Sequence, residues 1–267
     1  MSAAILAILP TAETAHAILD YAAHYAVLLG REILVLHPWA DPLSTTEMGE
    51  VLSVAGEQEI KAAQENVARI VAALVDDWAQ KHTPIRLRRH EKWGCMTHYI
   101  AACGAEAALI IAPASPPKSV GADALDAALF ETDRPMLVVP NDKLGGFSHL
   151  AVGWKTGDQW RDSVEAGQVF LAEFSTLTML HQGSLAPGDE QAARVAFGGL
   201  PGQINMVSIQ EDQRALGEIL AEQAVAARAD MLLIQANRHH KIMQWFTGSD
   251  SRSILANLRL PLLILNG

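Results

Sequence analysis

The side chains best placed to do chemistry in this chain lie near its end, after an apolar run at 230 to 235. Arg238 follows that run, and Gly248, Ser249 and Ser251 stand where a helical pattern begins. A Gly-Ser pair at the start of a helix can hold an anion through backbone N–H groups and hydroxyls, and an arginine can add positive charge. The alternative is structural: Ser249 caps the helix and Arg238 is solvated. The residues therefore suit a phosphate site or a helix cap.

Other kinds of chemistry have less support. His239 and His240 lie in the same segment, but no Cys or carboxylate stands beside them at ligand spacing, so we predict no metal site. Cys95 and Cys103 form no CxxC pattern, which favours two inert thiols. The chain also lacks the GxxxxGK[ST], GxGxxG, GxSxG and HExxH motifs, and we predict no catalytic residue.

A second candidate position is the end of the apolar run at 148 to 154. Trp154 closes that run, and an aromatic ring there can either stack on a base or complete the core. Lys155 follows it and can either meet a phosphate or be solvated as the strand ends. Both readings stay open at this point.

The elements that must position these residues repeat along the chain. Residues 105–140 and 227–266 share one order: an apolar run, a loop, an amphipathic segment, a proline and a closing apolar run. An internal repeat of this length predicts two similar domains in tandem. We place them at 1–141 and 147–267, with residues 142–146 as the linker.

Within each half, apolar runs alternate with helical patterns, which is typical of a parallel sheet covered by helices on both faces. A long helix is expected after Pro42, because Ser44 and Glu47 form a capping box and apolar residues recur at helical spacing up to Trp78. The second half holds only a short helix in that slot, near Asp189 to Phe197. The predicted strands lie near 3–9, 33–38, 84–90, 107–112 and 136–140, then 148–154, 175–181, 204–208, 230–235 and 262–266.

Composition limits the partners. The 267 residues are 50% hydrophobic and carry a formal charge of −10, which argues against nucleic acid or an anionic membrane as the main partner. The only basic cluster, in IRLRRHEK at 85–92, fits the solvated face of an exposed strand. No apolar run is long enough to span a membrane, and the N-terminus lacks a basic region before its apolar stretch. We therefore expect a cytoplasmic protein.

The repeat, the strand order and the final segment from 229 to 265 together resemble a tandem universal stress protein over nearly the whole chain. The resemblance includes the Trp-x-x-Gly approach to the last helix. It implies an α/β fold of two Rossmann-like, adenine nucleotide alpha-hydrolase-like domains, each with five parallel strands. It also implies that the domains pair through their last strands, as a pseudo-dimer within one chain.

The family's nucleotide pattern is Gly, two residues, Gly, nine residues, then Gly and Ser or Thr. In the second half these positions read Gln235, Arg238, Gly248 and Ser249, so the last pair is kept and both early glycines are lost. The family also places an Asp or Asn after the first strand, and neither half keeps it.

The first half departs further from the family pattern. Its corresponding positions fall near Ala112, Ser115 and Ala122-Asp123, and the acidic Asp123 repels phosphate. We therefore expect no ATP site of the usual kind in the first half.

Three hypotheses follow. The first is a non-enzymatic, universal-stress-protein-like stress-response protein that acts by binding, as an intramolecular pseudo-dimer, with ATP or AMP as the candidate ligand of the second half alone. The second is an interaction module that kept the fold, lost the nucleotide, and has an unknown protein partner or forms a homodimer of the tandem chain. The third is an enzyme that hydrolyses ATP or transfers adenylate. The candidate nucleotide-binding residues are Trp154, Lys155, Gln235, Arg238, Gly248, Ser249 and Ser251.

Overall fold

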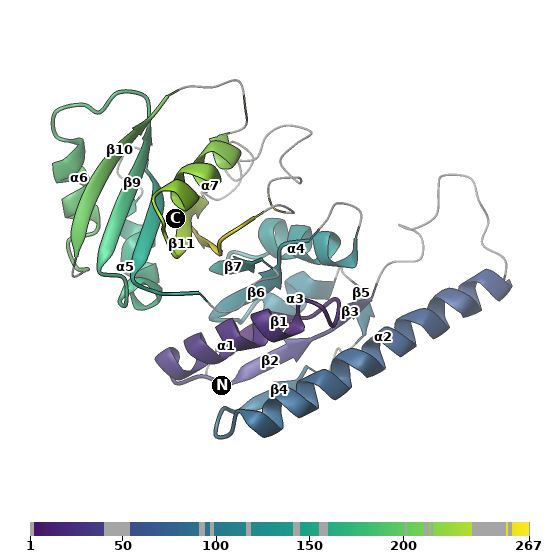
Figure 1. Ribbon diagram of the computed structural model, residues 1–267. Helices are drawn as coiled ribbons and strands as arrows, with labels where there is room; N and C mark the ends of the chain where they lie inside the picture. The colour runs from purple at the N-terminus through teal and green to yellow at the C-terminus, as the bar shows by residue number, and fades with distance from the viewer. Residues whose placement is uncertain are drawn as a thin grey trace. The chain divides into compact units, whose positions relative to one another are not determined.

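The chain folds into two compact units, residues 1–132 and 133–267, each built from strands and helices in alternation (Figure 1). The structure is a computed structural model. It describes residues 3–39, 54–90, 94–96, 99–115, 119–140, 145–154, 160–200, 202–210, 214, 216–236, 255 and 258–266.

The first unit is a parallel sheet with strand order β6-β1-β2-β4. A separate two-stranded ribbon joins β3 and β5. The elements in chain order are β1 Ile5–Ile8, α1 Ala15–Leu29, β2 Ile33–Leu36, β3 Pro38–Trp39, α2 Val54–Lys81, β4 Leu87–Arg89, β5 Cys95–Met96, α3 Ile100–Gly104, β6 Leu109–Pro113 and α4 Val120–Glu131.

The core of the first unit lies along its central strands. Every residue of β1 and β6 is buried, as expected for parallel strands covered on both faces. Helix α1 packs on β1, β2 and β6 and also contacts α2, while α4 packs on β6 and contacts α3. Since crossover connections are right-handed, α1 and α2 cover one face and α3 and α4 the other.

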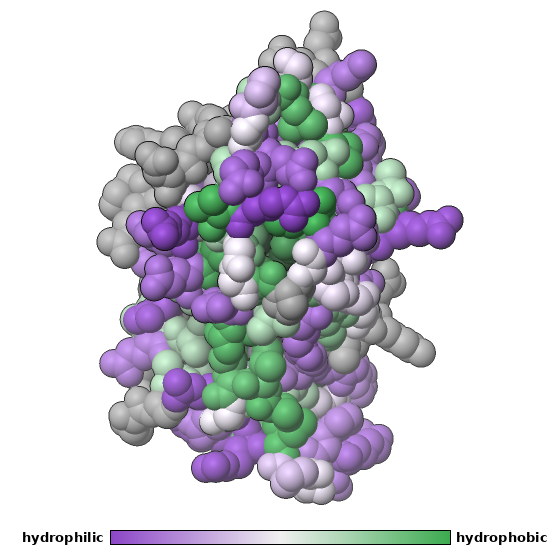
Figure 2. Space-filling view, turned by 90° about the vertical axis from the view of Figure 1, so that its left-hand side faces the viewer, coloured by the Kyte–Doolittle hydropathy of each residue, from purple (hydrophilic) through white to green (hydrophobic). Residues whose placement is uncertain are grey.

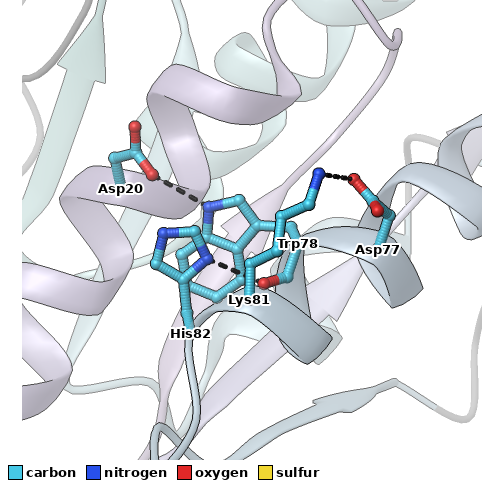
Figure 3. Close-up of polar contacts among 5 residues, drawn as sticks. All are labelled: Asp20, Asp77, Trp78, Lys81 and His82. Atoms are coloured by element: carbon cyan, nitrogen blue, oxygen red, sulfur yellow. Dashed lines mark hydrogen bonds and ion pairs between the residues drawn. The ribbon is translucent and has the colours of Figure 1, made fainter.

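Helix α2 is fixed at its C-terminal end by a tryptophan (Figure 3). Trp78 is 1% exposed, and its Nε1 donates to Asp20 Oδ1 of α1 at 2.9 Å. His82 stacks on the indole at 4.0 Å between ring centroids, and its Nδ1 donates to the Trp78 carbonyl oxygen at 2.7 Å. These contacts join the end of α2 to α1.

The second unit is a sheet of strand order β10-β9-β8-β11-β12-β7. All neighbours are parallel except β12 and β7. Its elements are β7 Met136–Val139, β8 His149–Trp154, α5 Trp160–Leu171, β9 Thr176–Gln182, α6 Asp189–Ala196, β10 Gln203–Ile209, α7 Leu216–Ala226, β11 Met231–Ala236 and β12 Leu262–Asn266. Helices α5 and α6 contact each other over one face, and α7 packs on β9 and β11.

The closing strands of the two repeats pair with each other, as the resemblance predicted. Leu137 of β7 lies opposite Leu263 of β12 in an antiparallel register. The strand that ends the first repeat therefore lies in the second compact unit, residues 133–267.

The starts of β8 and β11 are tied by one carboxylate. Asp230 Oδ2 accepts hydrogen bonds from the backbone N–H groups of Ser148 and His149 and from the Ser148 hydroxyl, each at 2.9 Å. Burial alone would raise the pKa of Asp230, but these hydrogen bonds and the nearby His149 outweigh it, so the pKa lies below its usual value.

All ten predicted strands are present, and two short ones, β3 and β5, were not predicted. The capping box at Ser44 and Glu47 lies outside the described residues. No described helix is long and apolar enough to cross a membrane.

Candidate functional site

Each unit has one position where a ligand is expected in an open parallel sheet. That position is the topological switch point, at the carboxyl ends of two adjacent strands whose following connections run toward opposite edges of the sheet. In the first unit it lies between β1 and β6, and in the second between β8 and β11. Trp154 and Gln235 stand at the second position.

The first position is filled by the chain itself. Pro10 and Ser115, which follow β1 and β6, are both buried. A Cβ at Gly121, near the start of α4, would lie 2.1 Å from Ser115 Oγ and 3.3 Å from Pro10 Cγ. Only glycine fits there, because the helix start rests directly on the two strand ends.

The end of β2, the strand next to β1, is also filled by a buried side chain. His37, which follows β2, is 2% exposed, and its Nδ1 donates to the Leu9 carbonyl oxygen at 2.7 Å. Burial lowers the pKa of His37, although this hydrogen bond acts in the opposite direction. A neutral imidazole therefore links the ends of β1 and β2.

Trp154 lies in an aromatic cluster at the end of β8. Its ring stacks on Trp160 of α5 at 5.8 Å between centroids and meets Phe197, just after α6, at 6.2 Å. Trp160 and Phe197 are 5.5 Å apart, and all three side chains are at most 2% exposed. The indole ring is thus part of the core of the second unit.

The cluster leaves one polar atom unsatisfied. Trp154 Nε1 is buried and has no hydrogen-bond partner among the described residues. A buried donor without a partner costs about 1–3 kcal/mol, so such atoms are rare and often mark a place that an acceptor completes. The corresponding position in the first unit is Leu9, whose side chain carries no hydrogen-bond donor.

Gln235 stands near the carboxyl end of β11, the strand next to β8. The β8–β11 pairing ends with Leu233 opposite Val152, and Gln235 and Trp154 each lie two residues farther along their strands. Gln235 is 7% exposed, and its Nε2 donates to Ser163 Oγ of α5 at 2.6 Å. Both candidate side chains therefore face α5.

The structure brings together these two of the seven candidate residues. The other five lie outside the described residues, as does the His239-His240 pair, and they are Lys155, Arg238, Gly248, Ser249 and Ser251. Sequence reasoning missed Trp160, Ser163 and Phe197. The first two are three residues apart at the start of α5, a spacing that shares one helix face and could have signalled their common role.

A serine, a histidine and an aspartate also meet near the ends of β9 and β10. Ser208 is opposite His181 in the sheet, and His181 Nε2 lies 4.0 Å from Asp189 Oδ2. The Ser208 hydroxyl donates to the Gly183 carbonyl oxygen at 2.6 Å. Because its proton points at that carbonyl, this serine is not paired with an imidazole base as a nucleophile requires.

Among the described residues, no three His, Cys, Asp or Glu side chains cluster as metal ligands would.

Comparison with known proteins identifies the fold. No protein-family model and no curated protein matches the sequence. A universal stress protein from Archaeoglobus fulgidus DSM 4304 matches 98% of this chain over 96% of its own, with 15% identity and a TM-score of 0.68. Two Pseudomonas aeruginosa proteins match 98% of this chain over 92% of theirs, both at 15% identity. One, from UCBPP-PA14, is assigned to the universal stress proteins and has a TM-score of 0.54; the other, from PAO1, is of unknown function and has a TM-score of 0.55. The chain has the fold of the universal stress proteins.

Proposed function

We propose that this chain, with its universal-stress-protein fold, is a stress-response protein that acts by binding and not by catalysis. We further propose that its single adenine-nucleotide site lies in the second unit. The observation that carries this proposal is the contrast between the two strand ends. Pro10, Ser115 and Gly121 pack together at the first, while at the second Trp154 Nε1 has no acceptor among the described residues.

The residues of the second unit suit an adenine nucleotide in two respects. Trp154 Nε1 offers a donor to a base or ribose acceptor, and the switch point between β8 and β11 is where parallel sheets bind nucleotides. Gly248, Ser249 and Ser251 keep the phosphate-binding end of the family pattern in sequence. Because the Trp154 ring already stacks on Trp160 and meets Phe197 edge-on, contact through its N–H is favoured over base stacking.

Thermal unfolding with and without ATP or AMP, each with Mg²⁺, tests the site. A nucleotide that binds only the folded state should stabilise it by about 2.7 kcal/mol at 100 times its dissociation constant. We expect this shift in the wild type and its loss in Ser249→Ala.

The matched control is Ser119→Ala, which changes the serine that caps α4 in the first unit, where Ser119 Oγ accepts from Ala122 N–H at 3.2 Å. Losing that cap should lower the melting temperature but leave the nucleotide shift intact. If the nucleotide-induced shift in melting temperature survives Ser249→Ala but is lost in Ser119→Ala, the nucleotide binds the first unit and the proposal is contradicted.

The second candidate function is a nucleotide-independent interaction module. It is favoured by the strand ends of the first unit, where the start of α4 at Gly121 packs directly against Ser115 and Pro10. No nucleotide effect on unfolding would favour this module over the proposed binding protein.

A further inference from the structure

Strand β10 is an edge of the second unit's sheet and carries none of the features that usually protect such an edge. Its seven residues, Gln203 to Ile209, include no charged side chain and no proline. The edge strand of the first unit is different: β4 has three residues, and both Arg88 and Arg89 are in ion pairs. Proteins commonly use short, charged edges of the second kind to prevent pairing with another chain.

The outward backbone groups of β10 belong to alternate residues. Gln203 N–H donates to the Ser175 carbonyl oxygen and the Ile209 carbonyl accepts from Gly183 N–H, so the odd-numbered residues face β9. Ile204, Met206 and Ser208 therefore direct their N–H and C=O groups away from the sheet. No described residue pairs with that side of β10.

The outward backbone groups of β10 can pair with the same groups of β10 in a second copy of the chain. In an antiparallel pair of β10 strands related by a two-fold axis at Met206, Met206 lies opposite Met206 of the second copy, and Ile204 lies opposite its Ser208. Each is a hydrogen-bonded pair, so every outward N–H meets a carbonyl. No charged residues come together, because β10 has none. A two-fold contact also closes both edges at once.

The side chains around this edge are compatible with a second strand. Ile204, Asn205, Met206 and Val207 are all half-buried, and α6 covers one face of β10 without occupying its edge. Figure 2 looks at the protein from this side and shows hydrophobic surface bordered by hydrophilic side chains. The loop before β10 is held tightly, since a Cβ at Gly202 would lie 2.3 Å from the Ser175 carbonyl oxygen.

The same sheet already contains one antiparallel strand pair at the end of a set of parallel strands. At its other end, β12 ends a set of parallel strands and pairs antiparallel with β7. An antiparallel β10 pair would repeat that arrangement between two chains.

We propose that β10 is a dimerisation edge, and that its partner is β10 of a second copy of this chain, paired antiparallel about Met206. The sheets of two second units then become continuous. A free peptide could use the same backbone groups, but only a second copy supplies the matching uncharged strand and the two-fold symmetry.

Light scattering after size exclusion, over a range of protein concentrations, tests the dimer. The wild type should have twice the 28.8 kDa mass of the chain. Met206→Pro removes one outward donor, and proline is tolerated in edge strands where the N–H faces outward. We expect it to raise the dimer dissociation constant at least about tenfold, equivalent to 1.4 kcal/mol.

Met206→Lys adds the charge that other edges carry and should also give monomers, which keeps the test decisive if the proline variant misfolds. Far-UV circular dichroism checks that each variant is folded. The matched control is Leu87→Pro, because Leu87 faces outward on β4: Arg86 and His90 both bond to β2. That variant should stay dimeric.

A wild type that is monomeric at every concentration overturns the proposal. So does a dimer that both folded Met206 variants retain.

Discussion

At the scale of residues, the two candidate ligand positions, at the end of β1 in the first unit and at the end of β8 in the second, differ in their buried polar groups. His37 is neutral and bonded to the Leu9 carbonyl in the first unit, whereas the buried Trp154 N–H of the second unit has no acceptor in the part of the chain that the structure describes. Buried polar groups normally have a partner, so the Trp154 donor marks a place that an acceptor would complete.

The neutrality of His37 predicts a pH dependence of stability. Burial lowers the pKa of the folded state below the ordinary value of 6.5. Between the two values, the unfolded chain binds a proton that the folded chain does not, so the free energy of unfolding falls as pH decreases below about 6.5. Above that pH this group has no effect. The loss is at most about 1.4 kcal/mol per pH unit.

Urea unfolding between pH 7.5 and pH 5.5 measures this effect. In His37→Gln an amide replaces the donor to Leu9 without titrating, so the variant should lose less stability across the interval than the wild type. Equal losses in both proteins would mean that His37 does not stay neutral on folding.

Two of the residues predicted for the site, Trp154 and Gln235, stand near the ends of the neighbouring parallel strands β8 and β11, and this placement follows from the strand pattern of the sequence. Their aromatic and polar neighbours Trp160, Ser163 and Phe197 come from α5 and from the end of α6. Those contacts depend on how the helices pack on the sheet, which spacing along one strand does not reveal.

At the scale of elements, the long helix α2 shows how a packing face is chosen. The apolar residues that recur at helical spacing include Val67 and Ile70, yet these are 37% and 47% exposed. The face that packs on the first unit instead uses Ala68, Val71, Val75 and Trp78. Two overlapping apolar stripes fit the sequence, and only tertiary contacts select between them.

Trp78 should therefore carry most of the attachment of α2. Trp78→Ala removes a fully buried ring and its hydrogen bond to Asp20, and should lower the free energy of unfolding by about 3–5 kcal/mol. Val67→Ala, on the exposed stripe of the same helix, should change it by about 0.5 kcal/mol or less. Urea unfolding at neutral pH compares the two. Similar losses in both variants would contradict this choice of face.

The strands were predicted more completely than the helices. Apolar runs bounded by turns located all ten strands of the main sheets, because parallel strands buried on both faces read as continuous apolar sequence. Strands β3 and β5 have two residues each and pair only with each other, which gives no run long enough to detect. The pairing of β7 with β12 came from the resemblance, since no local pattern encodes a partner so distant in sequence.

At the scale of the whole molecule, two copies of one fold have diverged at the same position. In the first repeat Pro10 follows β1, and the start of α4 packs against it. In the second, β8 ends in an aromatic cluster whose Trp154 Nε1 has no partner among the described residues. We therefore propose an asymmetric protein, in which the second unit alone binds nucleotide and the first supports the fold.

Equilibrium dialysis with labelled ATP and Mg²⁺, followed by chromatography of the recovered nucleotide, tests this claim most directly. We predict saturation at one nucleotide per chain, recovered as unchanged ATP, and loss of binding in Gly248→Asp, which places a negative charge at the expected phosphate position. Two nucleotides per chain, no binding, or conversion of ATP to product would contradict it.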